Sequence, residues 1–150
     1  MIYTMSNGYG DMANRFNLDY EKERALKEIA DEFDLELIIL FGSRAKGYAR
    51  EDSDCDVGVL RKEGLVPAER FLELAFRLTR ALKMGDVDLV DLRRASPILK
   101  YAAASSAKVL YEAEPGAFTR FLLLAWKMYQ DAKYDYLPYL DKYLTMRTGV

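Results

Sequence analysis

A nearly continuous apolar segment, LELIILF at residues 35–41, constrains the fold more than any other feature of this sequence. The segment lacks the strict alternation of polar and apolar residues that marks a strand with one face in water. A short run of this kind is typical of a strand that is covered on both faces of its sheet. The sequence therefore predicts a buried strand at 35–41, around which the rest of the chain must pack.

The segments on either side of this strand have the periodicities of further helices and strands. Helices are expected at about 20–33, 67–84, 97–104 and 116–146, the last interrupted near Pro138, and strands at 35–41, 55–60, 86–92 and 108–113. Asp19 and Ser96 are expected N-caps, Pro67 and Pro97 first helical residues, and Gly85 the C-terminal glycine of the second helix. This order predicts an α/β (α+β) fold, in which a small mixed β-sheet is backed by helices and a long C-terminal helix follows.

The length of 150 residues is most simply that of one domain with terminal additions. Residues 1–17 are rich in Gly, Asn and Ser without periodicity, and are expected to form a flexible N-terminal arm. Residues 18–114 would form the folded domain. Residues 115–150 would form a helical extension that packs on the domain or on a partner.

Composition excludes several classes of function. The chain has no histidine, which excludes His-ligated zinc and His-dependent nucleophilic catalysis. The net charge of −2 is not that of a polyanion-binding protein. The single cysteine, the absence of a secretory signal pattern and the shortness of the longest apolar run, at 121–126, indicate a cytoplasmic protein. Neither a membrane nor a nucleic acid is an expected direct partner.

Two aspartates stand in the second strand-like segment, where carboxylates are unexpected. Residues i and i+2 of a strand share one face, so Asp54 and Asp56 should project together while Cys55 and Val57 point into the core. Two like charges on a half-buried face repel each other and are costly to desolvate. A hard divalent cation removes that cost, and carboxylate pairs commonly hold Mg²⁺ next to substrate phosphates.

A third carboxylate is available on the next expected strand. If the strands at 55–60 and 86–92 are neighbours, Asp88 can complete a set of three acids around one or two Mg²⁺ ions. Asp86 lies on the same face and competes for this role, but its position at the strand edge beside Gly85 ranks it second. Asp91 should point to the opposite face.

The turn after the first strand supplies a candidate phosphate site. Gly42 would allow the backbone to approach a phosphate closely, and Ser43 would offer a hydroxyl and backbone N–H groups at a helix start. Arg44 and Lys46 add positive charge suited to triphosphate oxygens. One end of the site is therefore expected to hold metal and the other to hold phosphates.

Gly42-Ser43, ten residues, then Asp54-Cys55-Asp56 resembles the GSx10DxD signature of the nucleotidyltransferase β superfamily, and the surrounding sequence is most similar to its minimal MNT-type members. The likeness covers roughly residues 20–113. It implies a polymerase β-like nucleotidyltransferase fold and Mg²⁺-dependent transfer of a nucleoside monophosphate from a nucleoside triphosphate. The implied catalytic residues and metal ligands are Asp54, Asp56 and Asp88, and the implied nucleotide-binding residues are Gly42, Ser43 and Arg44. Tyr48 and Cys55 depart from the usual residue types, at positions that the chemistry does not require.

The resemblance also implies an acceptor. MNT-type proteins are often antitoxins of HEPN-domain toxins, and the family's activity is transfer of AMP from ATP to a toxin tyrosine, in a type VII-like toxin–antitoxin pair. The chain is too small to carry a separate acceptor-binding domain, which favours an acceptor on a partner protein. The aromatic residues of 131–146 are a candidate docking surface for that toxin, while those up to Tyr129 are expected to pack in the core.

Three alternatives remain open from the sequence. The aromatic C-terminal segment can instead fold back on the sheet or form a homo-oligomer. The enzyme can be a small-molecule nucleotidyltransferase that resembles the aminoglycoside-modifying enzymes. The protein can also be a non-catalytic antitoxin that acts by binding alone.

Overall fold

A computed structural model describes the backbone of residues 18–42, 45 and 55–148, and the side chains of these residues as far as Asp135. The helices are α1 (Tyr20–Phe33), α3 (Ala68–Leu82), α4 (Pro97–Ser106) and α5 (Ala117–Thr148); the strands are β1 (Leu35–Phe41), β2 (Cys55–Arg61), β3 (Val87–Asp91) and β4 (Lys108–Glu112). The predicted order of elements is confirmed for this part of the chain. The N-terminal arm expected at 1–17 lies outside the described residues.

The strands form one mixed sheet in the order β3-β2-β1-β4. β1 is antiparallel to both of its neighbours, β2 and β4, whereas β2 and β3 run parallel. The parallel pair is connected through α3, as a parallel pair must be through a crossover element. The predicted fold class, a small mixed sheet backed by helices, is confirmed.

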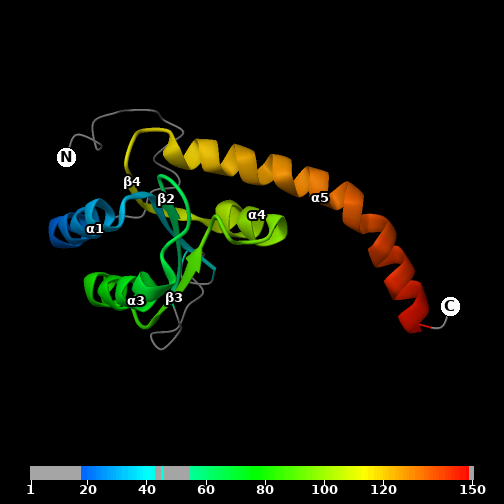
Figure 1. Ribbon diagram of the computed structural model, residues 1–150, viewed down its shortest axis with the longest axis horizontal. Helices are drawn as coiled ribbons and strands as arrows, with labels where there is room; N and C mark the ends of the chain where they lie inside the picture. Colours follow the sequence, from blue (N-terminus) through cyan, green and yellow to red (C-terminus); the bar gives the residue numbers. More distant parts are fainter. Residues whose placement is uncertain (1–17, 43–44, 46–54, 149–150) are drawn as a thin grey trace.

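Each face of the sheet has its own hydrophobic core, because β1 buries side chains on both sides. Ile38 and Leu40 join the core under α1 and α3, and Leu37 and Ile39 join the core under α4 and the start of α5. Figure 1 shows these two helix pairs on opposite sides of the strands. The prediction from the apolar run at 35–41 is therefore confirmed.

Two of the predicted helix starts are confirmed by side-chain caps. The Asp19 carboxylate accepts a hydrogen bond from the Lys22 N–H at 2.8 Å, and the Ser96 hydroxyl accepts one from the Leu99 N–H at 3.2 Å. These bonds satisfy backbone N–H groups that have no partner in the first turn of a helix. α4 continues to Ser106, two residues beyond its predicted end.

The predicted ends of α3 are wrong by a short distance. Pro67 lies at the N-cap, with extended ψ of 135°, and not at the first helical position. The helix ends at Leu82, its last buried residue, and Lys83 adopts the left-handed conformation with φ of 54°, while Gly85 lies two residues further on. Leu82 is the last fully buried residue of the helix, and Met84 beyond it is only partly buried against the same core.

The predicted interruption of the last helix at Pro138 is also wrong, because α5 continues from Ala117 to Thr148. A proline inside a helix removes one backbone hydrogen bond and bends the helix without necessarily ending it. Figure 1 shows α5 leaving the sheet and curving in its C-terminal part.

The first turn of α5 is fixed by Glu112 at the end of β4, whose Oε2 accepts a hydrogen bond from the Phe118 N–H at 3.0 Å. Among the described residues, no helix has the length and apolar character needed to cross a membrane.

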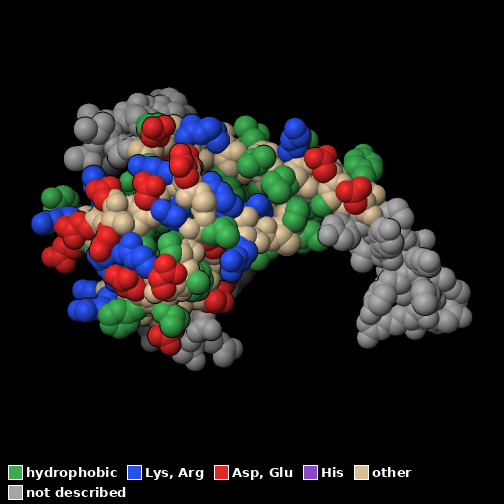
Figure 2. All heavy atoms as spheres, in the orientation of Figure 1, with side chains coloured by type: hydrophobic (Ala, Val, Ile, Leu, Met, Phe, Trp, Pro, Cys, Tyr) green, Lys and Arg blue, Asp and Glu red, His purple; other side chains and the backbone are tan. Residues whose placement is uncertain are grey.

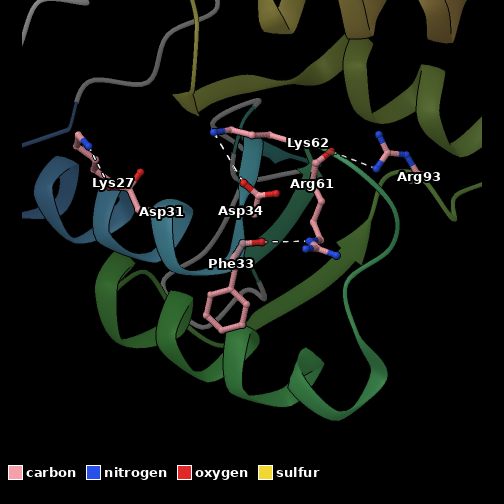
Figure 3. Close-up of polar contacts among 7 residues, drawn as sticks. All are labelled: Lys27, Asp31, Phe33, Asp34, Arg61, Lys62 and Arg93. Atoms are coloured by element: carbon pink, nitrogen blue, oxygen red, sulfur yellow. Dashed lines mark hydrogen bonds and ion pairs between the residues drawn. The ribbon is translucent and has the colours of Figure 1, made fainter.

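Charged side chains hold the connection between β2 and α3. Arg61 donates from Nε to the Phe33 carbonyl at 3.2 Å, and Arg93 donates to the Arg61 carbonyl at 3.1 Å (Figure 3). Asp91 is buried at the end of β3 and accepts from the Val66 N–H at 2.8 Å and from the Arg93 N–H at 3.1 Å. Asp91 therefore points away from the Asp88 face, as expected, and has a structural role.

We expect Asp91→Ala to lower the free energy of unfolding by about 2–3 kcal/mol, because the buried Val66 N–H loses its charged acceptor. Equilibrium unfolding in urea measures this change. Asp86→Ala is the matched control, since Asp86 is an exposed aspartate immediately before the start of the same strand; we expect a change within about 0.5 kcal/mol. Equal effects of the two substitutions would contradict the structural role of Asp91.

Candidate active site

Two acidic side chains lie opposite each other on the parallel strands β2 and β3. The register pairs Cys55 with Val87 and Asp56 with Asp88. Paired residues of neighbouring strands project from the same face, with the strands about 4.8 Å apart. Asp56 is partly buried and Asp88 is exposed, whereas Cys55 is fully buried on the other face. The condition on which the role of Asp88 depended, that the two strands are neighbours, is met, and Asp88 lies opposite Asp56.

Asp86 takes a different position. It precedes the first residue of β3, and its backbone carbonyl accepts a hydrogen bond from the Cys55 N–H at 2.8 Å. This bond extends the ladder between the two strands by one step and fixes their register. The register places Asp88, and not Asp86, directly opposite Asp56.

Gly42 covers the Asp56 carboxylate. β1 pairs with β2 up to Phe41 opposite Asp56, and Gly42 then turns the chain with φ of +76°. A methyl group added at Gly42 would lie 2.4 Å from Oδ2 and 3.3 Å from Cγ of Asp56. Both the left-handed backbone and the close contact require glycine here. Gly42 thus lies against the Asp56 carboxylate, while the predicted approach of its backbone to a phosphate stays a prediction.

Ser106 is a residue at this site that the sequence analysis missed. It is the last residue of α4, and its Oγ accepts a hydrogen bond from the Gly42 N–H at 3.4 Å. The expected helix ended at about residue 104, which left Ser106 in a loop. No pattern in the sequence distinguishes it from the adjacent Ser105, because their difference arises from the tertiary packing of α4 beside β1.

The remaining predicted site residues, Asp54, Ser43 and Arg44, lie outside the described residues, as does Lys46. Among the residues that are described, no three potential metal ligands gather in one place. The pair Asp56 and Asp88 nevertheless fits a magnesium ion in chemistry, because two hard carboxylate donors on adjacent strands are a common way to hold Mg²⁺ beside phosphates. The site thus consists of two neighbouring acids at one edge of the sheet, with the Gly42 backbone packed against one of them.

Comparisons with known proteins place the chain in a family. Residues 24–115 match the model of the family described as "Polymerase beta, Nucleotidyltransferase". The protein adenylyltransferase MntA of Shewanella oneidensis is 44% identical over 77 residues, which are 51% of this chain and 54% of MntA. The matched part thus spans about half the length of that curated relative.

Solved structures extend the similarity to most of the chain. A toxin–antitoxin structure with AMP-PNP superposes with a TM-score of 0.69 and 31% identity, over 81% of this chain and 98% of that one. A complex of tri-AMPylated Shewanella oneidensis HEPN toxin with MNT antitoxin superposes with a TM-score of 0.64 and 29% identity, over 82% and 96% of the two chains. From the fold, the paired acids and these matches, the chain belongs to the polymerase beta nucleotidyltransferase family.

Proposed function

We propose that this protein is a Mg²⁺-dependent protein adenylyltransferase that transfers AMP from ATP to a tyrosine hydroxyl of a HEPN-domain toxin. It would thereby act in the cytoplasm as the antitoxin of a type VII-like pair. The observation that carries the proposal is the in-register pair Asp56 and Asp88, with Gly42 packed on the Asp56 carboxylate. Similarity to MntA and to an antitoxin solved with an AMPylated HEPN toxin supports the choice of reaction and acceptor.

The proposed chemistry assigns a role to each residue. The tyrosine oxygen attacks the α-phosphorus of ATP, the bond from that phosphorus to the bridging oxygen breaks, and pyrophosphate leaves with the electron pair. Asp88, the exposed member of the pair, would accept the proton of the tyrosine hydroxyl. Gly42, Ser43 and Arg44 would bind the phosphates.

The same acids would hold the metal. Asp54, Asp56 and Asp88 would be its ligands, and Mg²⁺ when bound would neutralise charge on the phosphate oxygens. Asp56 would serve as a metal ligand from a fixed position, because the Gly42 backbone packs against its Oδ2. The contact between Gly42 and Asp56 thus joins the phosphate-binding end of the site to the metal-binding end.

A label-transfer experiment tests the proposal. The protein is incubated with Mg²⁺, ATP labelled at the α-phosphate and the product of the adjacent gene, and the label on that product is measured. We expect the label on a tyrosine of the partner. Pyrophosphate release with an aminoglycoside alone, and no label on the partner, would instead indicate a small-molecule nucleotidyltransferase.

The exposed surface of α5 is the candidate docking site for the toxin. Phe118, Phe121 and Ala125 are buried against the sheet, but Leu123 and Trp126 on the other side of the helix are 61% and 50% exposed. The expectation that the aromatics up to Tyr129 pack in the core is therefore wrong for Trp126. Tyr134, 77% exposed, continues the same side of the helix toward the C-terminus. Figure 2 shows hydrophobic side chains at the surface along this helix.

We propose that Leu123, Trp126 and Tyr134, the exposed strip of α5, contact the HEPN toxin. A large aromatic residue within an exposed apolar strip is the kind of side chain that dominates binding energy in protein interfaces. The strip lies on the side of α5 opposite the buried Phe121 and Ala125, so a toxin bound there would not have to displace the packing of the helix on the sheet. A homo-oligomer formed through the same strip is the competing arrangement.

The double variant Leu123→Ala/Trp126→Ala is expected to weaken toxin binding at least about 30-fold, because it removes the centre of the strip. The matched control is Leu72→Ala/Phe76→Ala on α3, whose two side chains are 80% and 61% exposed on the other side of the sheet. We expect that control to bind like the wild type in isothermal titration calorimetry. Equal binding by both double variants would contradict the assignment, and loss of a homodimer by the α5 variant in light scattering would support the competing arrangement.

A further inference from the structure

Sheet pairing places the end of α4 next to the turn that follows β1. β4 begins at Lys108, which pairs with Leu40, and one residue, the buried Ala107, separates β4 from α4. Ser106 therefore lies beside Gly42, 64 residues away in the sequence. The contact follows from the strand register, and it reaches Gly42, where an added Cβ atom would meet the Asp56 carboxylate.

The direction of the hydrogen bonds at Ser106 is determined. The Ser106 hydroxyl donates to the Ala102 carbonyl at 3.2 Å, so its proton already takes part in a hydrogen bond within α4. Its oxygen lone pairs then accept from the Gly42 N–H at 3.4 Å. The hydroxyl thus connects the backbone of α4 to the backbone of the turn.

Ser105 provides an internal comparison. Its hydroxyl makes the same type of bond, to the Tyr101 carbonyl at 2.7 Å, but it is exposed and no bond from Gly42 reaches it. The two serines therefore contribute alike to α4 and differ in their contact with the site.

We propose that Ser106 is a positioning residue for nucleotide binding, which holds the Gly42 turn in place over Asp56. This inference rests on the proposed function, in which Gly42 and Ser43 bind the ATP phosphates. Without the Ser106 hydroxyl, the Gly42 N–H loses its protein acceptor and the turn samples other conformations. A turn that is in its binding conformation for a smaller fraction of the time binds phosphate less tightly.

The test compares Ser106→Ala, Ser106→Thr and Ser105→Ala in the full chain. Calorimetry with a non-hydrolysable ATP analogue and Mg²⁺ should give a Kd about fivefold higher for Ser106→Ala, as expected for loss of one neutral hydrogen bond. In the transfer assay, KM for ATP should rise by a similar factor while kcat stays within about twofold, because the lost contact serves ground state and transition state alike. Ser106→Thr, which retains the hydroxyl, and Ser105→Ala should bind like the wild type.

Amide hydrogen exchange provides a readout that does not depend on activity. We expect faster exchange of the Gly42 amide in Ser106→Ala and no change in Ser105→Ala. Equal nucleotide affinity in Ser106→Ala and wild type would overturn the positioning role while leaving the proposed function intact. Equal loss of affinity in both alanine variants, with equal loss of thermal stability, would also overturn it. A wild-type protein that binds no nucleotide would instead overturn the proposed function itself, and this inference with it.

Discussion

Asp56→Asn is expected to lower the rate of AMP transfer by at least about 10³-fold while the protein remains folded. The substitution keeps the size of the side chain and removes the negative charge that the proposed metal site requires. Asp88→Asn, on the paired position of the neighbouring strand, should have an effect of the same order. Transfer of labelled AMP at saturating ATP measures the rates, and circular dichroism confirms folding.

Asp86→Asn is the matched control for these two variants. It makes the same chemical change two residues before Asp88, at a position that lies outside the pair with Asp56. We expect transfer within about twofold of the wild type, since exposed substitutions away from the site have small effects. Loss of transfer in Asp86→Asn, with Asp88→Asn active, would assign the third carboxylate to Asp86. It would contradict the assignment of that role to Asp88, which is drawn from the strand register.

Gly42→Ala is expected to lower the rate of AMP transfer at least about 100-fold. A displacement of a catalytic group by about 1 Å can reduce a reaction rate by this order. The added methyl group would lie 2.4 Å from Oδ2 of Asp56, so the carboxylate or the turn has to move. The left-handed φ of +76° adds a cost of about 1–2 kcal/mol for any residue with a Cβ atom. Stability and activity should therefore both fall.

Gly64→Ala separates these two effects. Gly64 has a similar φ of +71°, but an added methyl group there would meet only the Arg61 guanidinium at 4.0 Å. We expect a comparable loss of stability from the backbone conformation, measured by urea unfolding, and full transfer activity. Loss of activity in proportion to stability in both variants would show that the contact between Gly42 and Asp56 has no special importance.

The features that were predicted correctly depend on local signals. The run at 35–41 is apolar on both faces of a strand, and the structure buries both faces. Asp19 and Ser96 cap their helices because a cap requires only an oxygen placed three residues before an N–H. The neighbourhood of Asp56 and Asp88 followed once the strands at 55–60 and 86–92 were assumed to be adjacent.

The features that were missed depend on tertiary contacts. Trp126 is half exposed because the face of α5 toward the sheet is already occupied by Phe121 and Ala125. Ser106 belongs to the site because β4 aligns with β1, which no local pattern reports. Pro138 lies within a helix whose other residues continue the backbone hydrogen bonds. Composition and periodicity carry no information on which face of a helix is already filled or on which segments meet in the folded chain.

Intact-mass analysis of the partner toxin tests the central claim most directly. The toxin is produced together with the wild-type protein or with an Asp56→Asn/Asp88→Asn double variant, and growth is recorded for both strains. We predict toxin that carries AMP on a tyrosine with the wild type, and unmodified, growth-inhibiting toxin with the double variant. Unmodified toxin that is neutralised equally by both proteins would contradict the account and identify an antitoxin that acts by binding alone.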